Sequence, residues 1–184
     1  MSSSNLTTRS SQSDSVARWA SVTLYAALVT IGLMAGFFWA WDVQIMPGFA
    51  RLDDRTFVAA MQILIVVTEN PAFFLVSVGA FGFTAAAALV QRRRGQRLAA
   101  RWITVAFALY VVALLVTMAV HMPINYALVD EGDPSRITDL AAARDGFEVL
   151  WRVANVARTV TCVLALVCLG RALSVEGREQ GERR

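Results

Sequence analysis

The sequence contains no lysine, one histidine and only two cysteines among its 184 residues. Charged residues are also scarce, at 17% of the chain against 57% apolar residues, whereas soluble domains average about 25% and 45–50%. So little charge argues against a soluble enzyme, an intrinsically disordered chain and a nucleic-acid-binding module. A single histidine cannot supply the facial triad of a metal oxygenase, and two cysteines cannot staple a secreted domain. The sequence therefore predicts no metal and no disulfide framework.

Long uncharged segments dominate what remains. Residues 19–41, 70–91 and 102–129 contain no Asp, Glu, Lys or Arg, and each segment is long enough to cross a hydrocarbon core of about 30 Å as a helix. A fourth apolar segment contains Cys162 and Cys168, which lie on different faces of one helix and cannot bridge each other. The sequence thus predicts an all-α integral membrane four-helix bundle.

The second and fourth helices are expected to extend beyond the outer membrane face. The segment from Arg55 to Val90 corresponds to roughly 50 Å of helix, and Pro71 supplies a bend within it. The fourth helix, over 137–172, shows the same excess length, so the two helices should pack on each other outside the membrane. The chain is expected to divide into a disordered cytoplasmic tail (1–15), a four-helix transmembrane domain (16–172) and a second cytoplasmic tail (173–184).

All 17 basic residues are arginines, and their distribution is uneven. The two chain ends and the Gln91–Arg101 loop together hold eleven arginines and four acidic residues, whereas the other segments hold six arginines and ten acidic residues. Positive charge collects in the cytoplasmic loops of membrane proteins. We therefore expect both termini and this loop in the cytoplasm, and no nucleic-acid partner despite the basic composition.

The fourth helix carries a polar face within its apolar sequence. Arg158 lies 13 residues before Arg171, which places it roughly 20 Å from the cytoplasmic edge of the membrane. A guanidinium at that depth costs at least about 2–3 kcal/mol unless it faces the bundle interior or a wet cavity. Snorkelling and pairing with a carboxylate are the structural alternatives to a ligand-binding role. The residues that share this face within about 120° are Glu148, Trp151, Arg152, Asn155, Arg158 and Thr159.

His121 lies near the outer end of the third span, at a depth close to that polar face. Its imidazole is the one side chain of its kind available as a base near neutral pH, although a lone histidine at a span end is more often an interfacial residue. Asn125 lies one turn further on. Asn125 and Asn155 are candidates for hydrogen bonds to a ligand or, equally, for hydrogen bonds that join helices.

Other polar and aromatic residues near the outer boundary have two interpretations each. Trp151 either stacks on a ligand or anchors the helix at the interface. Arg152 either contacts a substrate or stays solvated or paired with Glu148. Glu69 and Asn70, beside Pro71, either form a wall of the same cavity or belong to a solvated kink.

Two motifs in these segments resemble a known family. They are His121-x-Pro123-Ile124-Asn125 in the third span and Trp151-x3-Asn155-x2-Arg158-Thr159 in the fourth. Shorter matches precede them: Gly36-Phe37-Phe38, Ile45-Met46-Pro47-Gly48-Phe49, and Phe57 through Met61-Gln62 to Asn70-Pro71. In this order the motifs resemble the anthrone-oxygenase-like family of small membrane proteins, over roughly residues 19–172. Many bacterial members of that family have no known function, and we expect a multi-pass protein of a bacterial inner membrane.

The resemblance implies a membrane oxygenase that converts an anthrone-like polycyclic substrate to a quinone with dioxygen and without a cofactor. It implies His121 as base, Arg158 as the cation that holds the enolate oxygen, and Asn125 and Asn155 as neutral hydrogen-bond donors. Substrate contacts are then expected at Trp151, Arg152, Glu69 and Asn70.

A non-catalytic membrane protein is the alternative to this enzyme. Such a bundle binds a quinone or lipid, or assists a membrane complex, and its polar face joins the helices instead of holding a substrate. The expected partners in either case are a hydrophobic small molecule and the lipid bilayer, and a homo-oligomer remains open.

Overall fold

The computed structural model describes the backbone of residues 3–181 and the side chains of residues 18–177, so parts of the two expected tails lie outside the described residues. All regular elements in the described part of the chain are helices, which confirms the all-α prediction. Four segments are long and apolar enough to cross a membrane: Arg18–Phe49, Pro71–Arg93, Arg97–Asp130 and Leu140–Gly177. The chain is therefore a multi-pass integral membrane protein.

The first span is longer than the sequence suggested. The helix α1 (Ser3–Ala40) continues through a π-helical segment, η1 (Trp41–Ile45), into the short α2 (Met46–Phe49). In the sequence, residues 42–54 (DVQIMPGFARLDD) predict the first outer connection, with a turn marked by Pro47 and Gly48. That prediction is wrong for residues 42–49, which are helical. Proline is tolerated in the first turn of a helix, where its missing N–H has no intrahelical partner, and Pro47 occupies such a position in α2.

The second helix is interrupted as well as bent. The helix α3 (Asp54–Thr68) begins with Asp53 as N-cap, whose carboxylate accepts from the Thr56 N–H at 3.1 Å. The hydrogen bonds from Thr56 lower the pKa of Asp53, so this cap is intact above the ordinary value of 3.8 and is lost as the pH falls through the lowered folded value. Asn70 then caps α4 (Pro71–Arg93), which starts at the proline.

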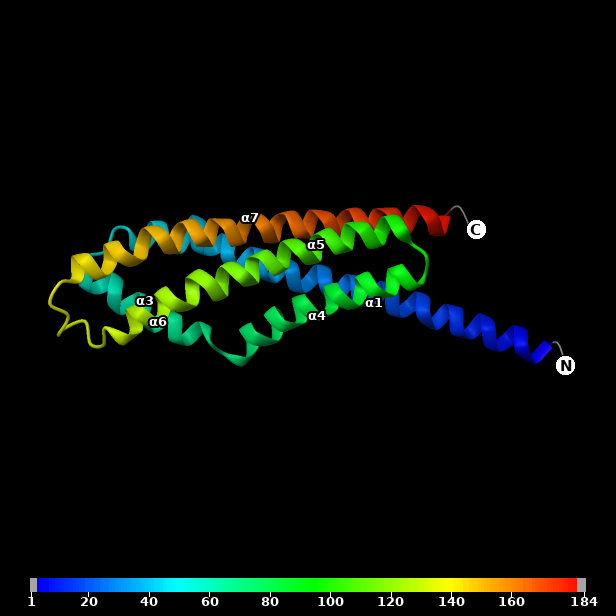
Figure 1. Cartoon of the computed structure of the whole chain (residues 1–184), viewed down its shortest axis with the longest axis horizontal. Helices are drawn as coiled ribbons and strands as arrows, with labels where there is room; N and C mark the ends of the chain where they lie inside the picture. Colours follow the sequence, from blue (N-terminus) through cyan, green and yellow to red (C-terminus); the bar gives the residue numbers. More distant parts are fainter. Residues whose placement is uncertain (1–2, 182–184) are drawn as a thin grey trace.

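The third and fourth spans are also continuous helices. The helix α5 (Arg97–Val116) passes through a second π-helical segment, η2 (Thr117–His121), into α6 (Met122–Asp130). The last helix, α7 (Leu140–Gly181), contains 42 residues and runs the length of the four-helix bundle (Figure 1). The domain boundaries stay predictions, although α1 already begins at Ser3.

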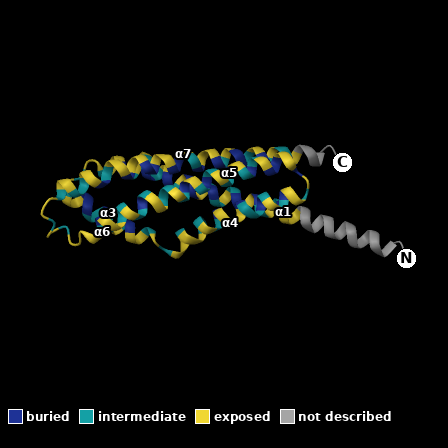
Figure 2. Ribbon diagram, in the orientation of Figure 1, coloured by how far each residue is buried: buried dark blue, intermediate teal, exposed yellow. Residues whose placement is uncertain are grey.

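The four spans pack in an up-and-down arrangement, in which α7 packs on α1 and α5, and α4 packs on the same two helices (Figure 1). One apolar core lies between the spans and includes Leu24, Ile31, Ile103, Tyr110 and Leu169. A second core lies at the end of the bundle opposite the two termini, called the outer end below after the expected topology, where α3 and α6 pack on α7. Its buried members include Met46, Phe57, Met61, Leu128 and Phe147. Figure 2 shows exposed residues along all four spans, and many of them are large apolar side chains, such as Leu75, Val78 and Val149, as lipid contact requires.

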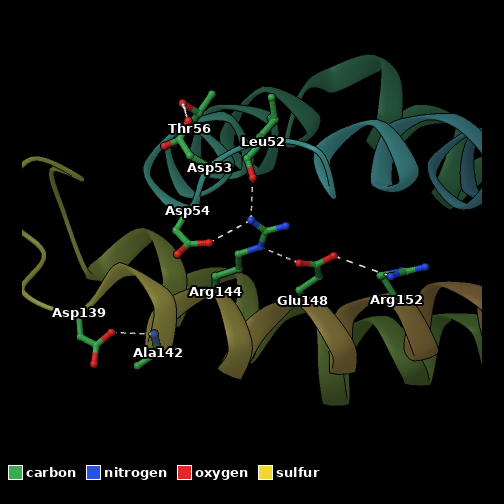
Figure 3. Close-up of polar contacts among 9 residues, drawn as sticks. All are labelled: Leu52, Asp53, Asp54, Thr56, Asp139, Ala142, Arg144, Glu148 and Arg152. Carbon is green, nitrogen blue, oxygen red and sulfur yellow. Dashed lines mark hydrogen bonds and ion pairs between the residues drawn. The ribbon is translucent and has the colours of Figure 1, made fainter.

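A charged cluster fastens α7 to the start of α3 (Figure 3). Arg144 donates to the Leu52 carbonyl at 2.9 Å, to Asp54 at 3.0 Å and to Glu148 at 2.8 Å. Its guanidinium also lies 4.4 Å from the centroid of the Phe57 ring. Arg144 thus links α7 to the residues before α3 and to the first turn of α3.

Replacing Arg144 with methionine should lower the free energy of unfolding by about 1–3 kcal/mol, because the Leu52 carbonyl and two carboxylates lose their charged donor. The measurement is the thermal unfolding midpoint in detergent. Arg152→Met is the matched control, because the Arg152 side chain is 52% exposed and its ion pair with Glu148 is long, at 3.8 Å. This change should alter the free energy of unfolding by less than about 0.5 kcal/mol. Equal effects of the two changes contradict this account.

The orientation in the membrane remains a prediction that labelling can test. Both described cysteines are buried and are first replaced by alanine. An impermeant thiol reagent added outside should then label Glu131→Cys and miss Arg93→Cys, because the arginine-rich side is expected to be cytoplasmic. Arg93 is preferred to Gly95, whose φ of 74° favours glycine. The reverse labelling pattern contradicts the assignment.

Candidate active site

The two π-helical segments, η1 and η2, border the same part of the bundle interior, in its outer half. The Met46 N–H bonds to the Trp41 carbonyl, and the Met122 N–H bonds to that of Thr117, so each segment contains an i to i−5 turn. Such turns insert one extra residue into a helix and frequently occur at functional sites. Trp41 and His121 are both buried as a result of this placement.

A cavity of about 410 Å³ lies between these segments and all four spans. Its walls are mostly aromatic and aliphatic, with contributions from α1, α3, α4, α5, α6 and α7. Few polar side chains reach it. Thr117, His121, Asn125 and Arg158 come from η2, α6 and α7, whereas Ser77 and Tyr110 come from α4 and α5, and Thr68 and Glu69 lie at its outer edge. The lining residues used below are Phe38, Glu69, Ser77, Tyr110, Thr117, His121, Asn125, Trp151 and Arg158.

Arg158 is buried and points into the bundle, as its depth in the membrane requires. Its Nη2 donates to the Asn155 side-chain oxygen at 2.7 Å, and its Nη1 reaches Thr117 only at 3.4 Å. The guanidinium carbon lies 4.3 Å from the Phe38 ring centroid and 5.8 Å from that of Trp151. Its Nε is buried without a hydrogen-bond partner. The depth of Arg158 in the sequence predicts Asn125, Glu69 or a ligand as its polar partner, whereas in the structure its short hydrogen bond goes to Asn155.

Asp42 is the counter-charge of this arginine, acting through Asn155. The Asn155 amide donates to the Asp42 carboxylate at 2.6 Å and to the Phe38 carbonyl at 2.9 Å, while Thr159 donates to the other carboxylate oxygen at 2.5 Å. Asn155 is fully buried and does not line the cavity. It is therefore a positioning residue that holds Arg158, not a ligand contact.

Asp42 was not among the predicted site residues, because the sequence predicts that an outer loop begins at this residue. The available signal was its position directly after Trp41, at the end of an uncharged run, on a helix that η1 continues. A carboxylate placed there can only be stabilised by facing the interior polar residues.

Asp42→Asn removes the negative charge but should keep both hydrogen bonds, with the new amide oxygen accepting from Asn155 and the new NH2 donating to the Thr159 hydroxyl. Ligand affinity should then change by less than about threefold, whereas Asp42→Leu should lower it by roughly tenfold or more, because Asn155 loses its acceptor and Arg158 its fixed orientation. Titration with a dihydroxyanthraquinone, followed by tryptophan quenching, measures this difference. If Asp42→Leu binds as tightly as the unaltered protein, Asp42 does not position Arg158.

His121 lies on the same side of the cavity and is buried. Neither ring nitrogen has a hydrogen-bond partner, although the backbone of Val116 and of Trp151 passes nearby. The Trp151 ring lies 5.2 Å away in an edge-to-face arrangement, and its Nε1 donates to the Asn125 side-chain oxygen at 3.1 Å. Trp151 therefore contacts both His121 and Arg158. These side chains form one cluster, as the sequence suggested.

A second polar pair lies deeper in the cavity. The Tyr110 hydroxyl donates to the Ser77 carbonyl at 3.0 Å and lies 3.2 Å from the Ser77 hydroxyl. Both residues line the cavity about two helical turns further from the outer face than Thr117. No sequence signal separated them from other small or aromatic residues of the spans.

The remaining candidates are divided. Glu69 lines the outer edge of the cavity, whereas Asn70 is the N-cap of α4 and is not among the lining residues. Arg152 and Glu148 also lie outside the cavity, in the charged cluster of Figure 3. In the described part of the chain, no three His, Cys, Asp or Glu side chains gather as a metal site.

Comparison with known proteins gives a family match. The sequence profile described as Anthrone oxygenase matches residues 61–168, which include Glu69, His121, Asn125, Trp151 and Arg158. Searches among curated proteins and among solved structures give no match. The matched segment covers more than half of the chain, from the middle of α3 to the inner half of α7. The chain belongs to the anthrone oxygenase family.

Proposed function

We propose that this protein is a cofactor-independent membrane oxygenase that converts an anthrone-like polycyclic substrate to the corresponding quinone. The observation that carries the proposal is the cluster of His121 and Arg158 on one side of an apolar cavity, each buried and with an unpartnered nitrogen. Buried polar atoms usually have partners. Their lack of partners here supports a ligand that supplies acceptors or protons at this point.

The chemistry needs a base, a cation and dioxygen. A base takes one proton from the methylene carbon between the rings, which leaves an electron-rich enolate. One electron passes from the enolate to dioxygen, and combination of the two radicals forms a carbon–oxygen bond and a peroxide. Loss of the second hydrogen from that carbon and cleavage of the O–O bond give the quinone and water. Each anthrone thus consumes one dioxygen and releases one water.

Arg158 is suited to hold the enolate oxygen. Its orientation is fixed by Asn155 and by the Phe38 ring before any ligand binds, and a preoriented cation in an apolar site stabilises developing negative charge more strongly than one in water. Asp42 is one residue further away, behind Asn155, so it orients the guanidinium without occupying the side that faces the cavity.

His121 is suited to remove the carbon-bound proton. A neutral imidazole has one nitrogen that can accept a proton, and neither ring nitrogen of His121 is occupied by another side chain. Trp151, between the two residues, offers an aromatic face or edge to a flat substrate. The cavity volume lies within the range of about 300–1,000 Å³ that is usual for small-molecule sites.

Oxygen uptake by the purified protein in detergent tests the proposal. With 1,8-dihydroxyanthrone as substrate, the protein should raise the uptake rate above that of empty micelles and heat-denatured protein, with one dioxygen consumed per quinone formed. The empty-micelle control is needed because anthrones also oxidise spontaneously. Saturable binding of the substrate without faster uptake favours the alternative, a protein that binds a quinone or lipid. Neither binding nor uptake contradicts both functions.

A further inference from the structure

The cavity has an opening between α4 and η2, on the side of the bundle. The exposed residues of its lining are Phe74, Val78 and Phe81 on α4 and Met118 on η2, with Glu69 at the outer edge. Figure 1 shows that α4 begins well apart from α5 and approaches it only toward the loop at residues 94–96. The four side chains within the helices are all apolar, so the opening suits contact with acyl chains and not with water.

The position along the helices places this opening at membrane depth. Phe81 lies 11 residues and Val78 lies 14 residues from Arg92, which corresponds to roughly 16 and 21 Å along α4. A hydrocarbon core of about 30 Å that starts near Arg92 therefore includes the opening in its far half.

The outer end of the cavity is closed. Gln62 of α3 donates to the Leu128 carbonyl at 2.8 Å and to the Gly132 carbonyl at 2.9 Å, which ties α3 to the end of α6. Beneath this tie, Phe57 and Met61 are fully buried in the outer core. A ligand that arrives from water past α3 and α6 has to disrupt this core, whereas a ligand dissolved in the bilayer meets only the apolar side chains of Phe74, Val78, Phe81 and Met118.

We infer that the cavity receives its ligand laterally from the lipid bilayer, through the opening between Val78 and Met118, and that the ligand is a flat, uncharged, lipid-soluble polycycle. The inference about the ligand rests on the proposed function, but the route does not. A polycycle concentrates in the hydrocarbon phase because burial of its apolar surface is favourable there. Lateral entry avoids returning that surface to water before it reaches Arg158.

The chain offers matched controls for the two residues at the opening. Val78 is 68% exposed, and Leu75 on the same helix is 75% exposed but does not line the cavity. Met118 is 62% exposed, and Leu115, one turn earlier, is 60% exposed and also lies outside the lining. Replacing Val78 and Met118 with phenylalanine adds bulk to the lipid-facing surface and narrows the opening. Replacing Leu75 and Leu115 with phenylalanine also adds bulk to this surface but leaves the opening unchanged.

Stopped-flow binding in mixed micelles tests the inference with two probes, a dihydroxyanthraquinone and anthracene, which has no oxygen atoms. For each probe that binds, Val78→Phe with Met118→Phe should lower the association and the dissociation rate constant by the same factor of about ten. The dissociation constant should then stay within about twofold of its original value. Leu75→Phe with Leu115→Phe should leave both rates unchanged. Binding is measured by the saturable quenching of tryptophan fluorescence. If a double variant fails to fold, each of its single substitutions is measured in its place.

The outcomes separate the route from the substrate class. Unchanged rates in the Val78 and Met118 variants, or equal slowing in the control pair, overturn lateral entry. An association rate that falls as protein concentration rises shows that a second copy covers the opening, which also contradicts free entry. If anthracene binds and the anthraquinone does not, the proposed substrate class fails while anthracene still decides the route. If neither probe binds the unaltered protein, the inference is wrong.

Discussion

Arg158→Leu should reduce anthrone-dependent oxygen uptake to the background rate and weaken binding of a dihydroxyanthraquinone by about 100-fold or more. Arg158 is buried, fixed by Asn155 and directed at the cavity, and loss of one preoriented donor to a developing oxyanion costs about 10²–10³ in rate in other enzymes. Arg158→Lys keeps the charge but has a different reach and no planar guanidinium over Phe38, so it should recover binding only in part.

The same change leaves Asp42 as a buried carboxylate without its counter-charge, so a loss of folding has to be separated from a loss of function. The double variant Arg158→Met with Asp42→Asn removes both charges. It should regain most of the thermal stability lost in Arg158→Leu and none of the oxygen uptake. Recovery of uptake in this double variant contradicts a role of Arg158 in the reaction.

His121→Asn should lower turnover by about 10²–10⁴-fold, the usual contribution of a positioned base, while the dissociation constant of the product quinone changes by less than about threefold. Asparagine keeps a hydrogen-bonding group at this position but cannot accept the proton from carbon. The two measurements are steady-state oxygen uptake and equilibrium binding in the same detergent.

Two further comparisons identify the step that His121 performs. A substrate deuterated at the methylene carbon should react more slowly than the protonated one in His121→Asn, because proton removal becomes rate-limiting. Tyr126→Phe is the control from the next helical turn. Tyr126 is exposed, does not line the cavity and contacts Glu69 instead of His121, so the change should have little effect on proton removal. Near-normal turnover of His121→Asn rules out His121 as the base, and Glu69→Gln then tests the carboxylate at the outer edge of the cavity.

The sequence was sufficient for the helices and for the centre of the site. Uncharged runs marked the membrane spans, and the depth of Arg158 in one of them required an interior position. Helical periodicity correctly placed Trp151 and Asn155 beside it. Arg152, at the edge of the same sector, instead turns toward the charged cluster outside the cavity. The 120° face predicted for the fourth helix was wide enough to include residues that point into the bundle and residues on the adjoining helix surface.

The rest depended on features that residue spacing does not encode. The extra residue in each π-helical turn keeps Asp42 and Thr117 on helices and directs them at α7. Pro47 indicated a turn because proline ends most helices, yet it stands where a new helical turn begins. Ser77 and Tyr110 lie 33 positions apart in the sequence, and only the packing of α4 on α5 brings these two side chains together.

The most direct test of the account is a structure of the protein with a dihydroxyanthraquinone bound. The account predicts the quinone inside the cavity, with one carbonyl oxygen within about 3 Å of an Arg158 nitrogen, the opposite carbon of the central ring next to His121, and the ring system against Trp151. A quinone bound elsewhere on the bundle, or in the cavity with no oxygen near Arg158, contradicts it.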